Sequence, residues 1–144
     1  GERLRALVTR PGHVREVMAA NRERALSLLA RVKLDGKADA LATDLSYGQQ
    51  KLVALARSLM NGGRCLLLDE PMAGVEGRTY DTMVQAIQAE AAAGTAICIV
   101  EHNVGFIQEL CTRGVFMVTG RVLADGPVDR IVADPTLTQL YFGT

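Results

Sequence analysis

Apolar and polar residues follow one another along this chain in a pattern that predicts helices and short strands in turn. Residues 13–33 carry apolar side chains at helical spacing, which predicts one helix with a single buried stripe. That stripe consists of Val14, Val17, Met18, Ala25, Leu28, Leu29 and Val32. A second helix is predicted from Ser46, a good N-cap, to about Met60, where Asn61-Gly62-Gly63 ends it.

Two short apolar runs, Cys65–Leu68 and Ala96–Val100, predict buried strands. In both runs the side chains on the two faces of the strand are apolar, as is typical of strands in the middle of a parallel sheet. A helix over about residues 78–93 separates them, and a short helix over about 104–111 follows. Because strands alternate with helices, the sequence predicts an α/β fold built in layers.

The last part of the chain has a different pattern. Residues 115–118 and 121–124 predict two strands joined by a turn at Thr119-Gly120. Two short helical pieces follow, and Pro135 begins the second one.

Composition narrows the classes of protein that fit. The chain has 144 residues, 49% of them hydrophobic, which is enough for one globular domain. Its formal net charge of +0 argues against a nucleic-acid partner. No apolar run approaches the roughly 20 residues that cross a bilayer, so we expect no direct membrane insertion. We expect Cys65, Cys98 and Cys111 to be buried free thiols.

Asp69 and Glu70 lie where the first predicted strand meets a loop. Ligands of open parallel sheets bind at the carboxyl ends of the strands. An aspartate there can hold Mg²⁺, and the neighbouring glutamate can polarise a water molecule for attack on a phosphate. The alternative is a strand that simply ends in two solvated carboxylates.

Ser46, Tyr47 and Gly48 begin a predicted helix, whose free amides attract anions. The alternative is an ordinary capped helix. His102 follows the second predicted strand and could bind a terminal phosphate, although a histidine in such a place is often purely structural.

Three motifs in this order resemble the ATP-binding cassette (ABC) family. They are Leu45-Ser46-Tyr47-Gly48-Gln49-Gln50, then Cys65-Leu66-Leu67-Leu68-Asp69-Glu70-Pro71, then Ile99-Val100-Glu101-His102. In that family they are the signature motif, the Walker B motif and the H-loop. The form of the signature, the residues after Glu101 and the tail around Asp134-Pro135 look most like ATPase subunits for uptake of branched-chain amino acids or urea.

The resemblance implies a role for each candidate residue. Ser46, Gly48 and Gln49 would contact ATP held by an opposite cassette, and Tyr47 stands where the signature has its second glycine. Asp69 would serve Mg²⁺, Glu70 would polarise water and His102 would sense the γ-phosphate. Glu76 falls in the D-loop, where the family usually has aspartate.

The resemblance also implies partners and organisation. It implies a second ABC ATPase subunit, transmembrane permease subunits and a peripheral place on the cytoplasmic face of the cell membrane. It assigns residues 1–45 to a helical subdomain, 46–126 to the catalytic core and 127–144 to a helical tail. The fold implied is a partial P-loop NTPase (RecA-like) layered parallel sheet that lacks the Walker A strand.

A Walker A loop needs glycine, four residues, then Gly-Lys-Ser/Thr. The one Gly-Lys pair, Gly36-Lys37, is followed by Ala38 and preceded at the required distance by Arg31. We therefore interpret the sequence as the carboxyl-terminal part of an import ATPase, inactive alone. Two alternatives are a non-catalytic cassette that binds a partner ATPase and a soluble cassette ATPase of DNA repair or translation.

Overall fold

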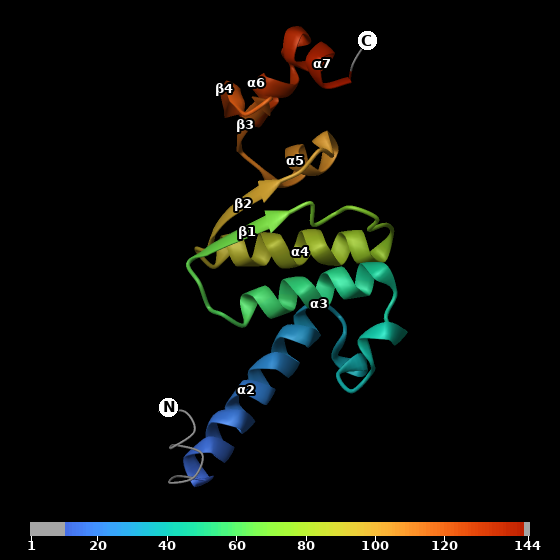
Figure 1. The fold of residues 1–144 in the computed structure, drawn as a ribbon, viewed down its shortest axis with the longest axis vertical. Coiled ribbons are helices and arrows are strands. Elements are labelled where there is room, and N and C mark those ends of the chain that lie inside the picture. The colour runs from blue at the N-terminus through green and yellow to red at the C-terminus, as the bar shows by residue number, and fades with distance from the viewer. Residues whose placement is uncertain (1–10, 143–144) are drawn as a thin grey trace. The chain divides into compact units, whose positions relative to one another are not determined.

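The structure, a computed structural model, describes residues 11–142 (Figure 1). Contacts divide them into two compact units, one of residues up to Leu67 with Ala73–Cys98 and one of Leu68–Met72 with the residues from Ile99 onward. Residues 1–10, part of the predicted helical subdomain, lie outside the described range, and so does the end of the predicted tail.

The helices and strands occur in the predicted order. Their bounds are α2 (Pro11–Arg31), two short 3-10 helices η1 (Asp35–Lys37) and η2 (Ala42–Asp44), α3 (Tyr47–Leu59), β1 (Cys65–Asp69), α4 (Arg78–Ala92), β2 (Ala96–Val100), α5 (Val104–Leu110), β3 (Arg113–Val118), β4 (Arg121–Pro127), α6 (Val128–Val132) and α7 (Pro135–Phe142). No helix among residues 11–142 combines the length and the hydropathy that crossing a bilayer requires.

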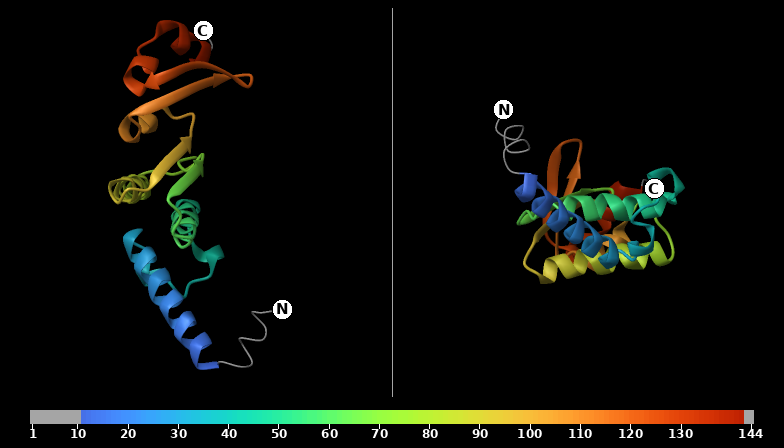
Figure 2. Two further views of the ribbon diagram at one scale, coloured as in Figure 1. Left: turned by 90° about the vertical axis from the view of Figure 1, so that its left-hand side faces the viewer. Right: turned by 90° about the horizontal axis from the view of Figure 1, so that it is seen from below.

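The core of the first unit lies between α2, α3 and α4, which contact each other in that order. Its apolar residues are buried at helical spacing, and they include Leu28, Val32, Leu52, Leu55, Ala56, Met83, Val84 and Ile87. Met83, Val84 and Ile87 lie on one face of α4, which therefore faces the core. The stripe predicted for α2 is wrong in its first half, because Val17 and Met18 are 45% and 66% exposed. In Figures 1 and 2, α2 meets α3 only at its C-terminal end.

The strands β1 and β2 form a parallel pair. The amide of Ala96 donates to the carbonyl of Arg64 at 2.9 Å, and the amide of Glu70 donates to the carbonyl of Val100 at 2.9 Å. Both strands therefore run in the same direction through this ladder. Helices α3 and α4 lie on the same side of the pair (Figure 1).

The prediction that β1 and β2 are buried on both faces is wrong for the described residues. Leu66 is the only residue of the two strands that is buried, and Leu67 and Val100 are 75% and 61% exposed. Cys65 and Cys98 are exposed and Cys111 is partly exposed, so the expected burial of the thiols is wrong as well. The physical reason is that a two-stranded pair with helices on one side keeps an open face and open edges.

In the second unit, β3 and β4 form the predicted antiparallel hairpin. Thr119 and Gly120 have φ of 47° and 77°, as both central residues of a two-residue type I′ turn require. The Arg113 guanidinium donates to both carboxylate oxygens of Asp125, at 2.9 and 2.8 Å. These hydrogen bonds lower the pKa of the Asp125 carboxyl.

We predict that a protein limited to the printed residues self-associates through the exposed, uncharged strand β2. Among residues 11–142, β2 pairs with β1 alone. Ala96–Val100 contains neither charge nor proline, and such an edge favours pairing with another chain. Sedimentation at increasing concentration, with a reductant present, should show dimers or larger species.

A matched variant separates edge pairing from other modes of association. Cys98 is exposed on β2, so Cys98→Lys adds a charge at the strand without emptying the core. We expect this variant to shift the equilibrium toward monomer. Wild-type protein that stays monomeric at all concentrations, or a lysine variant that associates equally, would contradict the prediction.

Candidate functional site

Asp69 and Glu70 lie at the carboxyl end of β1, as predicted. Glu70 has a φ of 43°, an uncommon backbone conformation for a residue other than glycine. Its amide donates to the carbonyl of Val100, the last residue of β2. The carboxylate of Glu70 is therefore held at the strand ends by a backbone that most side chains disfavour, as residues at functional sites often are.

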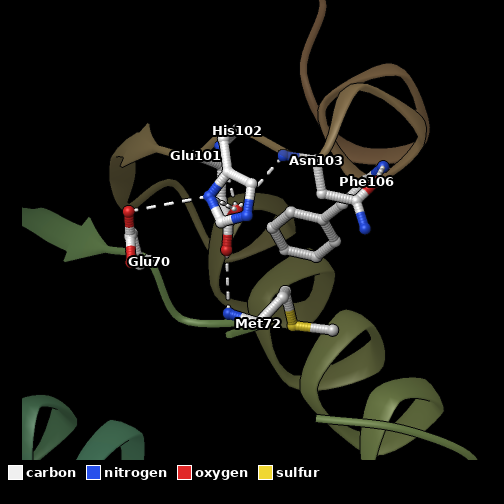
Figure 3. A network of polar contacts seen from close by, with 6 residues as sticks. All are labelled: Glu70, Met72, Glu101, His102, Asn103 and Phe106. Carbon is white, nitrogen blue, oxygen red and sulfur yellow. Dashed lines mark hydrogen bonds and ion pairs between the residues drawn. The ribbon is translucent and has the colours of Figure 1, made fainter. Parts of the chain in front are cut away.

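His102 lies beside Glu70 (Figure 3). Its Nδ1 is 3.6 Å from Oε1 of Glu70, and the two side chains are 67% and 56% exposed. The next residue, Asn103, is the N-cap of α5, because its Oδ1 accepts a hydrogen bond from the amide of Phe106 at 3.1 Å. The start of α5 thus fixes the loop that carries His102, and the ends of the two parallel strands bring His102 close to Glu70.

Glu101 is a third residue of this cluster, and the sequence motifs assign it no role. Its side chain is 1% exposed, and it accepts hydrogen bonds from backbone amides in two loops. A glutamate placed directly between an apolar strand and a candidate histidine is the only signal for it in the sequence. That signal is weak, because charged residues often end strands.

Ser46 caps α3 through a reciprocal pair of hydrogen bonds. Its Oγ accepts from the amide of Gln49 at 3.3 Å, and Oε1 of Gln49 accepts from the amide of Ser46 at 3.1 Å. This is a capping box, which the spacing Ser-x-x-Gln would have predicted. The candidate serine and glutamine are therefore held together at the start of the helix.

Tyr47 and Gly48 pack closely on neighbouring residues of the first unit. A Cβ on Gly48 would lie 2.9 Å from Cγ2 of Thr79 in α4, and one on Gly74 would lie 2.9 Å from Cε1 of Tyr47. Gly74 also has a φ of 69°, which favours glycine. The Nζ of Lys51 lies 5.7 Å from the centre of the Tyr47 ring. A larger residue at position 48 would therefore force the side chain of Thr79 to shift in the contact between α3 and α4.

The candidate residues form two groups, one in each compact unit. Ser46, Tyr47, Gly48 and Gln49 gather at the start of α3 in the first unit, where Glu76 is exposed in the loop before α4. Asp69, Glu70 and His102 belong to the second unit.

Asp69 fits the demands of a bound Mg²⁺ ion. Among residues 11–142, no three His, Cys, Asp or Glu side chains converge as a metal cage, and Asp69 is an exposed carboxylate at a strand end. Mg²⁺ with a nucleotide typically takes one or two protein carboxylates and completes its shell with phosphate and water. The donor set of this chain suits that mode of binding.

Comparison with known proteins identifies the family that this chain resembles. The family model for the ABC transporter domain matches residues 4–73. The glutamate/aspartate import ATP-binding protein GltL of Escherichia coli (strain K12) is 34% identical over 117 residues, which cover 81% of this chain and 48% of GltL. The probable branched-chain amino acid transport ATP-binding protein LivG of Archaeoglobus fulgidus is 32% identical over 121 residues, covering 84% of this chain and 47% of LivG.

A solved structure shows the same relationship in three dimensions. The nucleotide-free ATP-binding cassette of an ABC transporter superposes with a TM-score of 0.77 at 28% identity, over 85% of this chain and 50% of that one. The chain belongs to the ABC transporter ATP-binding family, and its fold is that of a partial P-loop NTPase. It spans about half the length of the curated relatives it matches.

Proposed function

We propose that the protein carrying this chain is the ATP-hydrolysing subunit of an ABC importer for amino acids. The single observation that supports this most strongly is the pair of Glu70 and His102 at the ends of two parallel strands, with Asp69 beside them. The names of GltL and LivG supply the class of cargo.

Each side chain has a distinct task in this proposal. Asp69 holds Mg²⁺, which neutralises charge on the phosphates when it is bound. Glu70 accepts a hydrogen bond from the attacking water and orients it, and its exposure leaves it accessible to that water. His102 donates a hydrogen bond to the terminal phosphate through a ring nitrogen.

The signature residues act on a different ATP molecule. Ser46, Tyr47, Gly48 and Gln49 present the start of α3 to a nucleotide held by a second ABC ATPase subunit, and Glu76 lies in the D-loop. Transmembrane permease subunits hold this pair at the inner face of the membrane. Within this organisation, residues 1–45 form the helical subdomain, 46–126 the core and 127–144 the tail.

We further propose branched-chain amino acids as the cargo. The signature with Tyr47 and the residues around His102 support this, and so does the similarity to LivG. Uptake of labelled leucine, valine and isoleucine by cells that carry the wild-type or the Glu70→Gln protein tests it, with labelled glutamate and urea as alternatives. Loss of glutamate uptake alone would overturn the branched-chain proposal.

Ser46→Arg in the complete protein is a direct test of the signature role. We expect ATP-dependent dimer formation to be lost, because a long cationic side chain at the start of α3 blocks the second subunit. Binding of ATP to a single subunit should change by no more than about twofold. In this proposal Ser46 contacts the ATP of the other subunit, so the contacts of the subunit's own ATP are unchanged. Gel filtration with ATP and titration with a fluorescent ATP analogue measure the two effects.

Two variants control for local damage to the helix. Ser46→Ala removes the capping hydrogen bond at a cost of about 1 kcal/mol without adding bulk. Ser58→Arg adds the same charge at the other end of α3. Dimer formation that survives in Ser46→Arg, or that fails equally in Ser58→Arg, would argue against the assignment.

A further inference from the structure

Glu101 is a buried carboxylate next to the candidate histidine. Its side chain is 1% exposed, in contrast to those of Glu70 and His102. Burying a carboxylate is costly unless hydrogen-bond donors replace the lost water. The hydrogen-bond donors to Glu101 therefore indicate the role of this buried carboxylate.

Three backbone amides donate to the Glu101 carboxylate. Oε1 accepts from the amide of Met72 at 2.9 Å. Oε2 accepts from the amides of His102 and Asn103, at 3.1 and 3.4 Å. Met72 belongs to the loop after β1, whereas His102 and Asn103 belong to the loop after β2. A single side chain thus connects the two loops (Figure 3).

The surroundings of this connection are apolar. Phe106 is 0% exposed and Met72 is 6% exposed, and Figure 3 shows both beside the Glu101 carboxylate. Hydrogen bonds to a charged acceptor are stronger where water is excluded. The hydrogen bond between Met72 and the buried Glu101 carboxylate is therefore stronger than an exposed one of the same length.

The two loops carry the two groups that the chemistry needs close together. Glu70 precedes Met72 by two residues in the first loop, and His102 follows Glu101 directly in the second. Nδ1 of His102 lies 3.6 Å from Oε1 of Glu70 and 3.8 Å from Oε2 of Glu101.

We infer that Glu101 is a positioning residue, which joins the loop after β1 to the loop after β2 and so sets the distance between Glu70 and His102. This inference rests on the proposed ATPase function. In this role Glu101 does not contact the nucleotide. Glu101 affects turnover only because it positions His102.

The alternative is a simpler role, in which Glu101 only accepts hydrogen bonds from the amides of its own loop. Aspartate distinguishes the two roles. Glu101→Asp withdraws the carboxylate by about 1.5 Å, one carbon–carbon bond. A shorter side chain can still reach the amides one and two residues later, as aspartates do in turns, but it no longer reaches Met72.

The experiment uses the complete protein with Glu101→Asp, Glu101→Gln, His102→Ala and Glu101→Asp/His102→Ala, and with exposed Glu16→Gln as the control for lost charge. We expect both Glu101 variants to lower kcat for ATP by about 10-fold, the lower end of what outer partners of a site contribute. KM should stay within about twofold. The double variant should be no slower than His102→Ala alone, since residues that act as a unit are not additive.

Amide hydrogen exchange measures the hydrogen bond between Met72 and Glu101 directly and does not depend on ATP turnover. In Glu101→Asp the amide of Met72 should exchange at least about 10-fold faster, because its hydrogen bond opens. Unchanged exchange at Met72, unchanged kcat, or losses that multiply in the double variant would each overturn the inference. Absence of turnover in the wild type would refute the proposed function instead, and the exchange at Met72 would still decide whether Glu101 joins the loops.

Discussion

Glu70→Gln in the complete protein should lower kcat for ATP by about 100-fold or more, the contribution expected of a positioned base. The amide keeps the size and shape of the side chain at the end of β1 and removes its charge. The side chain of Glu70 is 56% exposed, so the substitution leaves no buried cavity. Binding of ATP should stay within about twofold, because the change affects a group that orients water rather than nucleotide.

Steady-state turnover and titration with labelled ATP measure the two quantities separately. Glu109→Gln, on α5 in the same unit, is a matched control that should turn over ATP at close to the wild-type rate. An equal loss of binding and turnover in Glu70→Gln would show that Glu70 holds the nucleotide. Wild-type turnover in the variant would remove Glu70 from the chemistry altogether.

A protein limited to the 144 printed residues should hydrolyse ATP no faster than the buffer background. Phosphoryl transfer depends mainly on positioning and on stabilisation of charge around the β- and γ-phosphates. The lysine and amides of a Walker A loop supply much of that, and the printed residues contain no such loop. Glu70 and His102 would then have no held phosphate on which to act.

Release of labelled phosphate under single-turnover conditions is sensitive enough to decide this. The same preparation of Glu70→Gln is the control for a contaminating ATPase, whose activity the substitution would leave untouched. Turnover that depends on Glu70 in the short protein would contradict the prediction. It would also show that another part of the chain holds the nucleotide.

Local patterns predicted the elements of this fold well. Ser46, Gly62 and the Thr119-Gly120 turn act over a few residues, and each of them begins or ends an element where the sequence predicts it. Burial depends instead on what covers a surface. The apolar runs of β1 and β2 predicted strands correctly, but only Leu66 is buried, because one face of the pair is open.

The residues of the candidate site were predictable from the sequence, but their long-range contacts were not. The spacing of the motifs identified the strand-end carboxylates, and the topology of parallel strands explains why Glu70 and His102 meet. The role of Glu101 could not be read from the sequence, because it depends on the amide of Met72, which lies 29 residues away along the chain. The contact of Gly48 with Thr79 is equally non-local.

The positive φ of Glu70 has a consequence for how this protein can evolve. A side chain in that conformation costs on the order of 1 kcal/mol, which glycine would not incur. Selection for heat resistance alone would therefore accept glycine at position 70 and discard the charge that the proposed chemistry needs. Stability and activity compete at this one residue, so a heat-tolerant variant of the protein has to gain its stability elsewhere.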